Sequence, residues 1–315
     1  MPICISGSFA YDTIMQFEGQ FAEHILPDKV HMLNVSFLVP AMKREFGGCA
    51  GNIAYAVRQL GGDARPLATI GSDGAPYLQH LQNHGINTRG IKVLDDSYTA
   101  QCFITTDTGN NQISAFHPGA MAHAHTALLA DAFDSDAPLR LGIIAPNGKE
   151  GMQQHALAMA AVGLPFVFDP GQALSQFSGA ELLALLAPAS YVAVNDYEAH
   201  LLKQKTGLDM HEISRRCKGV LVTKGEHGVD VLIDGEASAI QAVTATRVVD
   251  PTGCGDAFRG GLLVGLVNGH SLLRSAQIGC VMGSRKIASA GGQNYQISWT
   301  EVEQALRNHY GTAPN

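Results

Sequence analysis

The 315-residue sequence has few charged residues, no closely spaced cysteine pair and no long apolar run. Charged residues make up only 16% and hydrophobic residues 46%, a compact globular composition and not a disordered one. The net charge of −7 argues against an extended basic face, so we expect no nucleic-acid partner. No apolar stretch approaches the roughly 20 residues that span a bilayer. The first residues enter a strand without a basic segment, so we expect a cytoplasmic protein without a signal peptide or membrane contact.

The cysteines and histidines form no metal-site pattern. The six cysteines are scattered over the chain without a C-x-x-C pair, which argues against a disulfide framework and against structural zinc. The closest of the 13 histidines are His80 with His84 and His123 with His125. Neither pair has a carboxylate in a pattern such as H-E-x-x-H, so we interpret them as surface or core residues.

The most informative stretch runs from Val248 to Gly261 and reads VVDPTGCGDAFRGG. A strand-like start leads into a turn of small residues and then into a buried helix that we predict from residue 257 to 267. Small residues before a helix leave its first amide N–H groups open, an arrangement that favours an anion. Asp256 beside such a site fits a general base that takes a proton from a hydroxyl group. The alternative is an ordinary first-turn carboxylate that complements the helix dipole.

Two well-known phosphate-binding motifs are excluded. The pattern G-x-x-x-x-G-K-[ST] does not occur in the chain, and Phe258 stands where G-x-G-x-x-G requires its third glycine. The turn is therefore neither a P-loop nor a dinucleotide-binding fingerprint.

The remaining chain predicts an α/β fold. Short apolar runs at 2–7, 64–71, 141–145, 165–168, 191–194, 219–223 and 229–233 alternate with helical stretches, which indicates a mainly parallel sheet with helices on both faces. Strand-like pieces at 35–39, 99–106 and 112–117 fall in two excursions, approximately 13–45 and 96–122. We expect one domain over 1–315, with these insertions forming a small β-sheet lid.

Polar residues follow several of the predicted strands, at the sheet edge where such folds bind ligands. They are Asn147, Asp169, Asn195, Glu198, Lys224 and Glu226. Asn195 and Glu198 are also typical of a helix N-cap with a first-turn carboxylate, and that alternative stays open. Earlier in the chain, the glycine-rich segment 47–54 contains Gly48 and Asn52 before a helix; it fits either a polyol site or a tightly packed loop.

These segments together resemble the ribokinase (PfkB-type) family of carbohydrate and nucleoside kinases. Residues 250–256 resemble its D-x-x-G-x-G-D signature, residues 47–54 its G-G-x-x-x-N-x-A signature, and residues 195–198 its N-x-x-E motif. Residues 223–228 are similar to its T-x-G-x-x-G nucleotide loop. The resemblance covers nearly the whole chain and looks closest to bacterial adenosine kinases. It implies a ribokinase-like three-layer fold and transfer of the ATP γ-phosphoryl group to the 5′-hydroxyl of adenosine, a purine-salvage reaction that gives AMP.

The resemblance also assigns expected roles. Asp256 would be the catalytic base, and Gly253, Cys254 and Gly255 would form the anion hole. Expected acceptor-binding residues are Ser8, Asp12, Ser36, Gly48, Asn52, Phe116, Met121 and Gln172, with Asp12 on the ribose hydroxyls. Expected ATP-binding residues are Asn195, Thr223, Lys224, Gly225 and Gly228, with Mg²⁺ held by Glu198 through water. Lys224 fits a surface position equally well, and Phe116 and Met121 fit the core of the lid sheet. The family often has a monovalent-cation site near the Asp250 loop, so K⁺ is a candidate further cofactor.

One departure bears on the acceptor. The adenosine kinases are expected to carry a stacking aromatic three residues before Thr105-Thr106, and this chain has Cys102 there, followed by Phe103. Base stacking on an aromatic side chain is worth about 1–3 kcal/mol. A broader nucleoside kinase and a ribokinase-like sugar kinase are therefore the alternatives, and a non-catalytic nucleoside-binding protein is a third. The sequence leaves a monomer and a homodimer open, and likewise ATP and GTP as donor.

Overall fold

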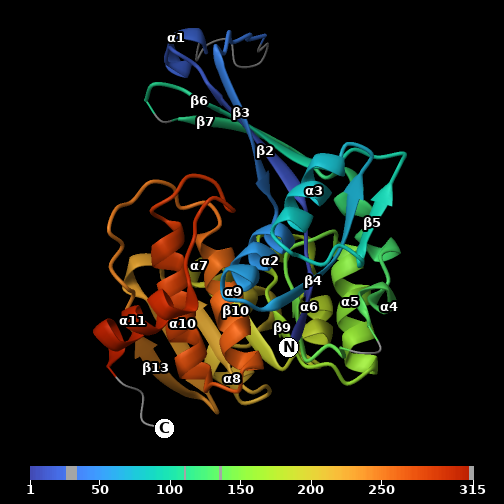
Figure 1. The fold of residues 1–315 in the computed structure, drawn as a ribbon, viewed down its shortest axis with the longest axis vertical. Helices are drawn as coiled ribbons and strands as arrows, with labels where there is room; N and C mark the ends of the chain where they lie inside the picture. Colours follow the sequence, from blue (N-terminus) through green and yellow to red (C-terminus); the bar gives the residue numbers. More distant parts are fainter. Residues whose placement is uncertain (26–33, 110, 135–136, 312–315) are drawn as a thin grey trace.

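The computed structural model describes residues 1–25, 34–109, 111–134 and 137–311. These residues form two β-sheets, a large one between layers of helices and a smaller one that projects from one end of the molecule (Figure 1). Within the described ranges, no helix is both long enough and apolar enough to cross a membrane.

The large sheet has nine strands among the described residues, in the order β13-β12-β11-β10-β9-β8-β1-β4-β5. All neighbouring pairs from β5 to β11 are parallel, and β12 and β13 add an antiparallel edge. The strands are β1 (Pro2–Ser6), β4 (Asp63–Gly71), β5 (Ile91–Leu94), β8 (Leu141–Ile144), β9 (Phe166–Phe168), β10 (Tyr191–Asn195), β11 (Val220–Thr223), β12 (Val229–Ile233) and β13 (Glu236–Ile240). The expected mainly parallel α/β sheet is confirmed.

Two layers of helices cover the sheet because its central strands are apolar on both faces. Ile3 and Ile5 of β1 pack in one core and Cys4 between them packs in the other, as the alternation of side chains along a strand requires. The first layer contains α2 (Cys49–Gln59), α3 (Ala75–Asn83), α9 (Cys254–Val267), α10 (Leu272–Lys286) and α11 (Trp299–Tyr310). The second contains α4 (Leu129–Ala132), α5 (Lys149–Ala161), α6 (Gly179–Leu186), α7 (Asp196–Thr206) and α8 (Met210–Ser214). Short 3₁₀ helices lie at Gly119–Thr126, Gly171–Gln176 and Gly225–His227.

The smaller sheet joins the two excursions of the chain. Its order is β3-β2-β6-β7, from β2 (Ala10–Gln16), β3 (Ala41–Gly47), β6 (Ala100–Thr106) and β7 (Gln112–His117), and α1 (Phe21–His24) lies at its outer end (Figure 1). The parallel pairing of β2 with β6 connects segments about ninety positions apart in sequence. The expected separate small sheet is confirmed, and β6 and β7 match the strands predicted at 99–106 and 112–117, whereas β2 and β3 were not predicted as strands.

Two local predictions need correction, and an edge strand was not predicted. The strand expected at 35–39 is absent: residues 34–39 have no regular structure, and Phe37 instead packs on Phe17 and Phe21 with ring centroids 4.9 Å apart. Its alternating pattern therefore reflects a loop that covers an aromatic cluster. The helix expected from residue 257 begins at Cys254, because Gly253 adopts φ 76° and forms its N-cap. The edge strand β13 was not predicted, since four of its five residues are exposed and it lacks an apolar run.

Candidate functional site

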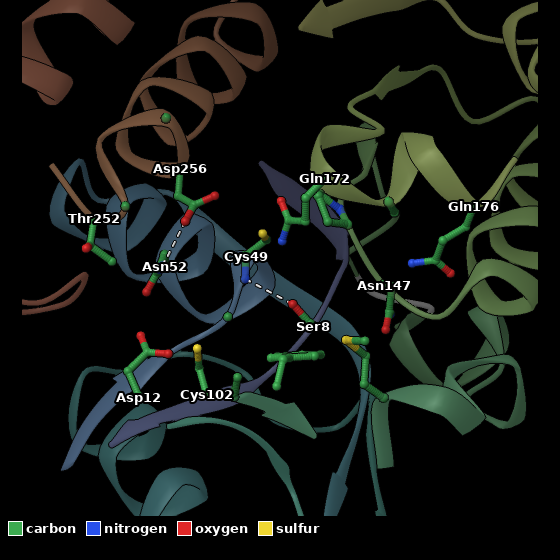
Figure 2. Close-up of a pocket in the computed structure, with 18 residues that line it drawn as sticks. Ser8, Asp12, Cys49, Asn52, Cys102, Asn147, Gln172, Gln176, Thr252 and Asp256 are labelled. Atoms are coloured by element: carbon green, nitrogen blue, oxygen red, sulfur yellow. Dashed lines mark hydrogen bonds between the residues drawn. The ribbon is translucent and has the colours of Figure 1, made fainter. Parts of the chain in front are cut away.

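A cavity of about 440 Å³ lies where the carboxyl ends of the large sheet face the smaller sheet (Figure 2). Its lining comes from β2, β6 and β7 of the smaller sheet, from the N-termini of α2 and α9, and from the turns after β1, β8 and β9. The lining residues are Ser8, Ala10, Asp12, Gly48, Cys49, Asn52, Cys102, Phe116, Met121, Pro146, Asn147, Gln172, Ala173, Gln176, Thr252, Gly253, Gly255 and Asp256. The structure thus brings together most of the predicted acceptor and catalytic residues.

Asp256 lies in the first turn of α9, with its carboxylate on the cavity (Figure 2). Gly253 as a left-handed N-cap turns the chain so that the first amides of α9 open beside it. Burial raises the pKa of the Asp256 carboxyl to about 6, although the hydrogen bond from Asn52 acts in the opposite direction. A carboxyl group with a pKa near 6 is ionised at neutral pH and is a better proton acceptor than an ordinary aspartate.

Asn52 of α2 connects this carboxylate to a buried hydrogen-bond network. Its Nδ2 donates to Asp256 Oδ2 at 2.8 Å (Figure 2). Its Oδ1 accepts from Gln293 Nε2 at 3.1 Å. Gln293 also donates to Tyr77 Oη at 2.7 Å, and Tyr77 donates to the carbonyl oxygen of Gly47 at the end of β3. Asn52 therefore holds Asp256 in one orientation. The sequence offered no signal for Gln293 or Tyr77.

Arg259, one turn after Asp256, was also missed by the sequence analysis. It is buried and makes a two-bond ion pair with Asp169, at 3.0 Å for both Nε–Oδ2 and Nη2–Oδ1. Burial acts to lower the pKa of Arg259, but Asp169 raises it, so the guanidinium stays charged behind Asp256. The position of Asp169 just after a predicted strand indicated that Asp169 lies near the site. Nothing in the sequence indicated that Arg259 is its partner.

A single row of side chains crosses the smaller sheet at the cavity. Asp12 of β2 is paired with Glu45 of β3 on one side and with Cys102 of β6 on the other, and Cys102 is paired with Phe116 of β7. Directly paired residues lie on the same face of a sheet. Burial raises the pKa of Asp12 to about 6, with further contributions from Asp250, Asp256 and Glu45. Asp12, Cys102 and Phe116 thus face the large sheet together.

This row contains Cys102, the position where the family resemblance leads us to expect a stacking aromatic residue. Cys102 lines the cavity, whereas Phe103 is the next residue along β6 and points to the opposite face of the sheet. Phe103 therefore cannot occupy the place of an aromatic at 102. Phe116 is 54% exposed, so it is not part of a lid-sheet core and presents its ring to the cavity.

The turns after β1, β8 and β9 supply polar groups on the opposite wall. Ser8 Oγ accepts from the amide of Cys49 at 3.2 Å, and Gln172 and Asn147 lie nearby in the lining (Figure 2). Gly48 caps α2 with φ 84°, where an added Cβ would lie 2.5 Å from the Ser8 carbonyl oxygen, so glycine is required. Cys49 and Gln176 are lining residues that the sequence analysis did not single out.

The predicted nucleotide residues lie outside this cavity. Asn195 and Thr223 are directly paired at the ends of β10 and β11, so they share the same sheet edge as Asp169. Glu198 Oε2 accepts from the Asn195 amide at 2.8 Å, and burial raises the pKa of Glu198. Gly225 and Gly228, with φ 56° and 87°, form the turn between β11 and β12.

Two predicted residues have side chains that point to other partners or lie away from the cavity. Lys224 Nζ forms an ion pair with Asp230 Oδ1 at 2.6 Å, which favours the surface alternative. Ser36 is exposed in the irregular segment before β3 and does not line the cavity. Among the described residues there is also no group of three or more His, Cys, Asp or Glu side chains that could hold a metal ion.

A comparison with known proteins identifies the class. Residues 14–299 match the sequence profile of the pfkB family carbohydrate kinases, and the chain belongs to that family. It is a phosphotransferase whose acceptor is an alcohol group, on a ribokinase-like fold.

Three similar proteins of this family are two nucleoside kinases and one ribokinase. The structure of Burkholderia thailandensis nucleoside kinase in complex with inosine shares 47% sequence identity, covers 99% of both chains and has a TM-score of 0.87. The nucleoside kinase of Methanocaldococcus jannaschii is 29% identical over 279 residues, 88% of this chain and 90% of its own. A ribokinase from Thermotoga maritima, at 22% identity and a TM-score of 0.79, shares the fold.

Proposed function

We propose that the protein is a nucleoside kinase that transfers the γ-phosphoryl group of ATP to the 5′-hydroxyl of adenosine and of other purine nucleosides. The observation that carries the proposal is the cross-strand row of Asp12, Cys102 and Phe116, which faces Asp256 across the cavity. A carboxylate suits ribose hydroxyls and an apolar aromatic suits a base, so the row matches both halves of a nucleoside.

The cavity orients the acceptor between its two walls. Asp12 would accept hydrogen bonds from the ribose 2′- and 3′-hydroxyls, close to Gly48 and Asn52. Phe116 and Met121 would pack against the base, while Ser8 and Gln172 offer polar groups to its edge. Ser36 would contribute only if its segment moves toward the cavity as the lid closes.

Asp256 would remove the proton of the 5′-hydroxyl. Its raised pKa and its fixed orientation on Asn52 suit this step. The amides of Gly253, Cys254 and Gly255 at the start of α9 would stabilise the charge on the transferred phosphoryl group, as a helix N-terminus does for an anion. Positioning and charge stabilisation carry most of the catalysis in phosphoryl transfer.

ATP would lie along the sheet edge next to the acceptor cavity, over Asn195, Thr223, Gly225 and Gly228. Lys224 would reach phosphate only by leaving Asp230. Mg²⁺ would supply charge neutralisation on the phosphates, mostly with phosphate and water ligands, and Glu198 would hold one of these waters. Burial raises the pKa of Glu198, so this carboxylate gains from a nearby cation. The smaller sheet would act as a lid that excludes water.

The breadth of the acceptor range is the part of the proposal that Cys102 supports. Without an aromatic side chain at position 102, Phe116 would be the one ring that packs on the nucleobase, and a second ring that selects adenine by stacking would be missing. The structure of the relative at 47% identity contains inosine. An acceptor range that includes adenosine and inosine therefore fits this relative and Cys102 better than adenosine alone.

ADP release with ATP·Mg²⁺ and a panel of adenosine, inosine, guanosine, cytidine, ribose and fructose tests the proposal. We expect comparable kcat/KM for adenosine and inosine and much slower turnover of the free sugars. A reaction without enzyme serves as the blank. Turnover of ribose or fructose alone would contradict the assignment, and turnover of adenosine alone would restrict it to an adenosine kinase.

A further inference from the structure

Lys286, the last residue of α10, is completely buried, which is rare for a lysine. Its Nζ donates to the carbonyl oxygen of Asp250 at 2.7 Å and to that of Ser289 at 3.2 Å. It also lies 3.8 Å from Asp250 Oδ2. Three oxygen atoms from two separate segments therefore converge on one ammonium group.

The same two segments are tied to each other by further hydrogen bonds. Asp250 Oδ2 accepts from the Gly291 amide at 2.7 Å, which joins the two segments, and Asp250 Oδ1 accepts from the Thr252 amide at 2.9 Å within its own segment. The amides of Val249 and Asp250 both donate to the carbonyl oxygen of Ile287, at 2.9 and 3.2 Å. Lys286 thus lies at the centre of a junction between residues 249–252 and 286–291.

This junction contacts both the helix that carries Asp256 and the Asn52 side chain that orients Asp256. Residues 250–252 lead directly into Gly253, the N-cap of the helix that carries Asp256. At the other end of the junction, Gly292 packs so closely on the Asn52 side chain that a Cβ there would overlap its Oδ1. A shift of the junction would therefore move both Asp256 and the residue that orients it.

Carbonyl and carboxylate oxygens that converge in this way form the donor set of a monovalent cation. The family resemblance led us to expect K⁺ near the Asp250 loop. A potassium ion does not fit, because the ammonium of Lys286 already uses the carbonyl oxygens of Asp250 and Ser289. We propose that Lys286 is a built-in cation that fixes the turn before α9, so that the enzyme needs no dissociable monovalent ion. Lys286 is a positioning residue, since it acts through the turn.

The first test compares the wild-type enzyme in KCl and in tetramethylammonium chloride at equal ionic strength. We expect initial rates that agree within about twofold, since no ion is lost on exchange. A fall of tenfold or more without K⁺, equal to about 1.4 kcal/mol of transition-state stabilisation, would overturn the proposal. This test rests on the kinase activity with whichever acceptor the protein uses.

The second test removes the ammonium in two ways. Lys286→Ala should lower kcat at least about tenfold in tetramethylammonium, with a smaller change in nucleoside KM, and K⁺ or NH₄⁺ should restore it in a saturable way. Lys286→Met fills the same space without charge, so we expect the loss without rescue. Arg285→Ala, at the adjacent exposed position, should show neither effect.

Thermal unfolding gives a readout that does not depend on activity. A cation that binds only the folded Lys286→Ala protein raises its Tm with concentration by mass action, whereas the wild-type Tm should not distinguish K⁺ from tetramethylammonium. Equal responses of the wild type, Lys286→Ala and Arg285→Ala to K⁺ would contradict the inference even if the acceptor were misassigned.

Discussion

Asp256 is the residue on which the proposed chemistry depends. Asp256→Asn keeps an oxygen that can accept the hydrogen bond from Asn52 but cannot take a proton at neutral pH. We expect kcat to fall by about 10²–10⁴-fold, the usual contribution of a general base, with little change in nucleoside affinity. Steady-state kinetics and calorimetric titration of the variant measure the two quantities. Near-normal turnover would show that another group acts as the base.

The pKa of Asp256 sets a pH dependence with a definite sign. Its carboxyl must be ionised to accept the proton, and burial raises its pKa to about 6. Activity should therefore be full above pH 7 and fall as the pH drops through about 6, with one further contribution from Asp12, whose pKa is also raised to about 6. The pH profile of kcat/KM between pH 5 and pH 8 measures this. A profile that is flat down to pH 5 would exclude Asp256 as the titrating base.

The same two raised pKa values have a consequence for stability. A carboxyl whose pKa is higher in the folded state than in the unfolded state destabilises the fold above that pKa, and the penalty disappears as the pH falls through about 6 toward 4. Asp12→Asn and Asp256→Asn should therefore raise Tm at pH 7.5, by roughly 2–4 °C for each kcal/mol gained.

The gain should shrink as the pH approaches 5, which thermal unfolding at both pH values would show. Asp209→Asn is the control, because the hydrogen bond from the Glu212 amide lowers the pKa of Asp209. That substitution should not stabilise the protein. A Tm increase of the same size at every pH would contradict the electrostatic cause.

The roles of single residues could be predicted where the residue belongs to a sequence motif. They could not be predicted where the role depends on a contact with a residue far away in the sequence. Asp12, Asn52 and Asp256 belong to short patterns in the sequence, and the structure brings all three to one cavity. Arg259 contacts Asp169, 90 positions away, and Lys286 contacts Asp250, 36 positions away. No local sequence pattern predicts these contacts.

At the scale of elements, the crossing of α2 and α9 fixes the distance between the two glycine-rich signatures. A Cβ at Gly260 would overlap Ala56 Cβ and approach the Val57 amide, so the backbones themselves must shift. Gly260→Ala should destabilise the protein by about 1–3 kcal/mol through overpacking and lower kcat as α9 moves.

Gly283→Ala is the matched control in α10. A Cβ there meets only the Cys254 carbonyl oxygen at an ordinary 3.6 Å, so the substitution should stabilise by about 0.5–1 kcal/mol through helix propensity. Denaturant unfolding of both variants measures the difference. Equal effects would show that the helix crossing tolerates an extra methyl group.

Elements were predicted correctly where burial left an apolar run, as in β8, whose four residues are all buried. They were missed or misplaced where packing and pairing depended on other segments. β13 follows its pairing with β12 and buries only Ile240 of its five residues, and the alternation at 35–39 arises from contacts with Phe17 and Phe21. Local periodicity carries no information on such contacts.

At the scale of the whole molecule, the smaller sheet presents the exposed aromatic side chain of Phe116 to the cavity. If it closes on the nucleoside, binding buries Phe116 and gives a negative heat-capacity change. Phe116→Ala should weaken nucleoside binding by about 1–3 kcal/mol and make this change less negative. Calorimetric titration at several temperatures measures both quantities.

Ile113 provides the control on the same strand. It is 45% exposed but points to the opposite face of β7, so Ile113→Ala should leave nucleoside affinity and the heat-capacity change as they are. Equal effects of the two substitutions would show that the cavity face of the smaller sheet is not special for binding.

The row that we propose to bind the acceptor takes Asp12, Cys102 and Phe116 from three neighbouring strands of the smaller sheet. The proposed base and anion site lie at the start of α9, a helix that packs against the large sheet. Recognition and chemistry can therefore change independently in evolution. Under this proposal, a point mutation in this row would change which acceptor is preferred and leave the residues of phosphoryl transfer unchanged, so that new substrate ranges arise without a new fold.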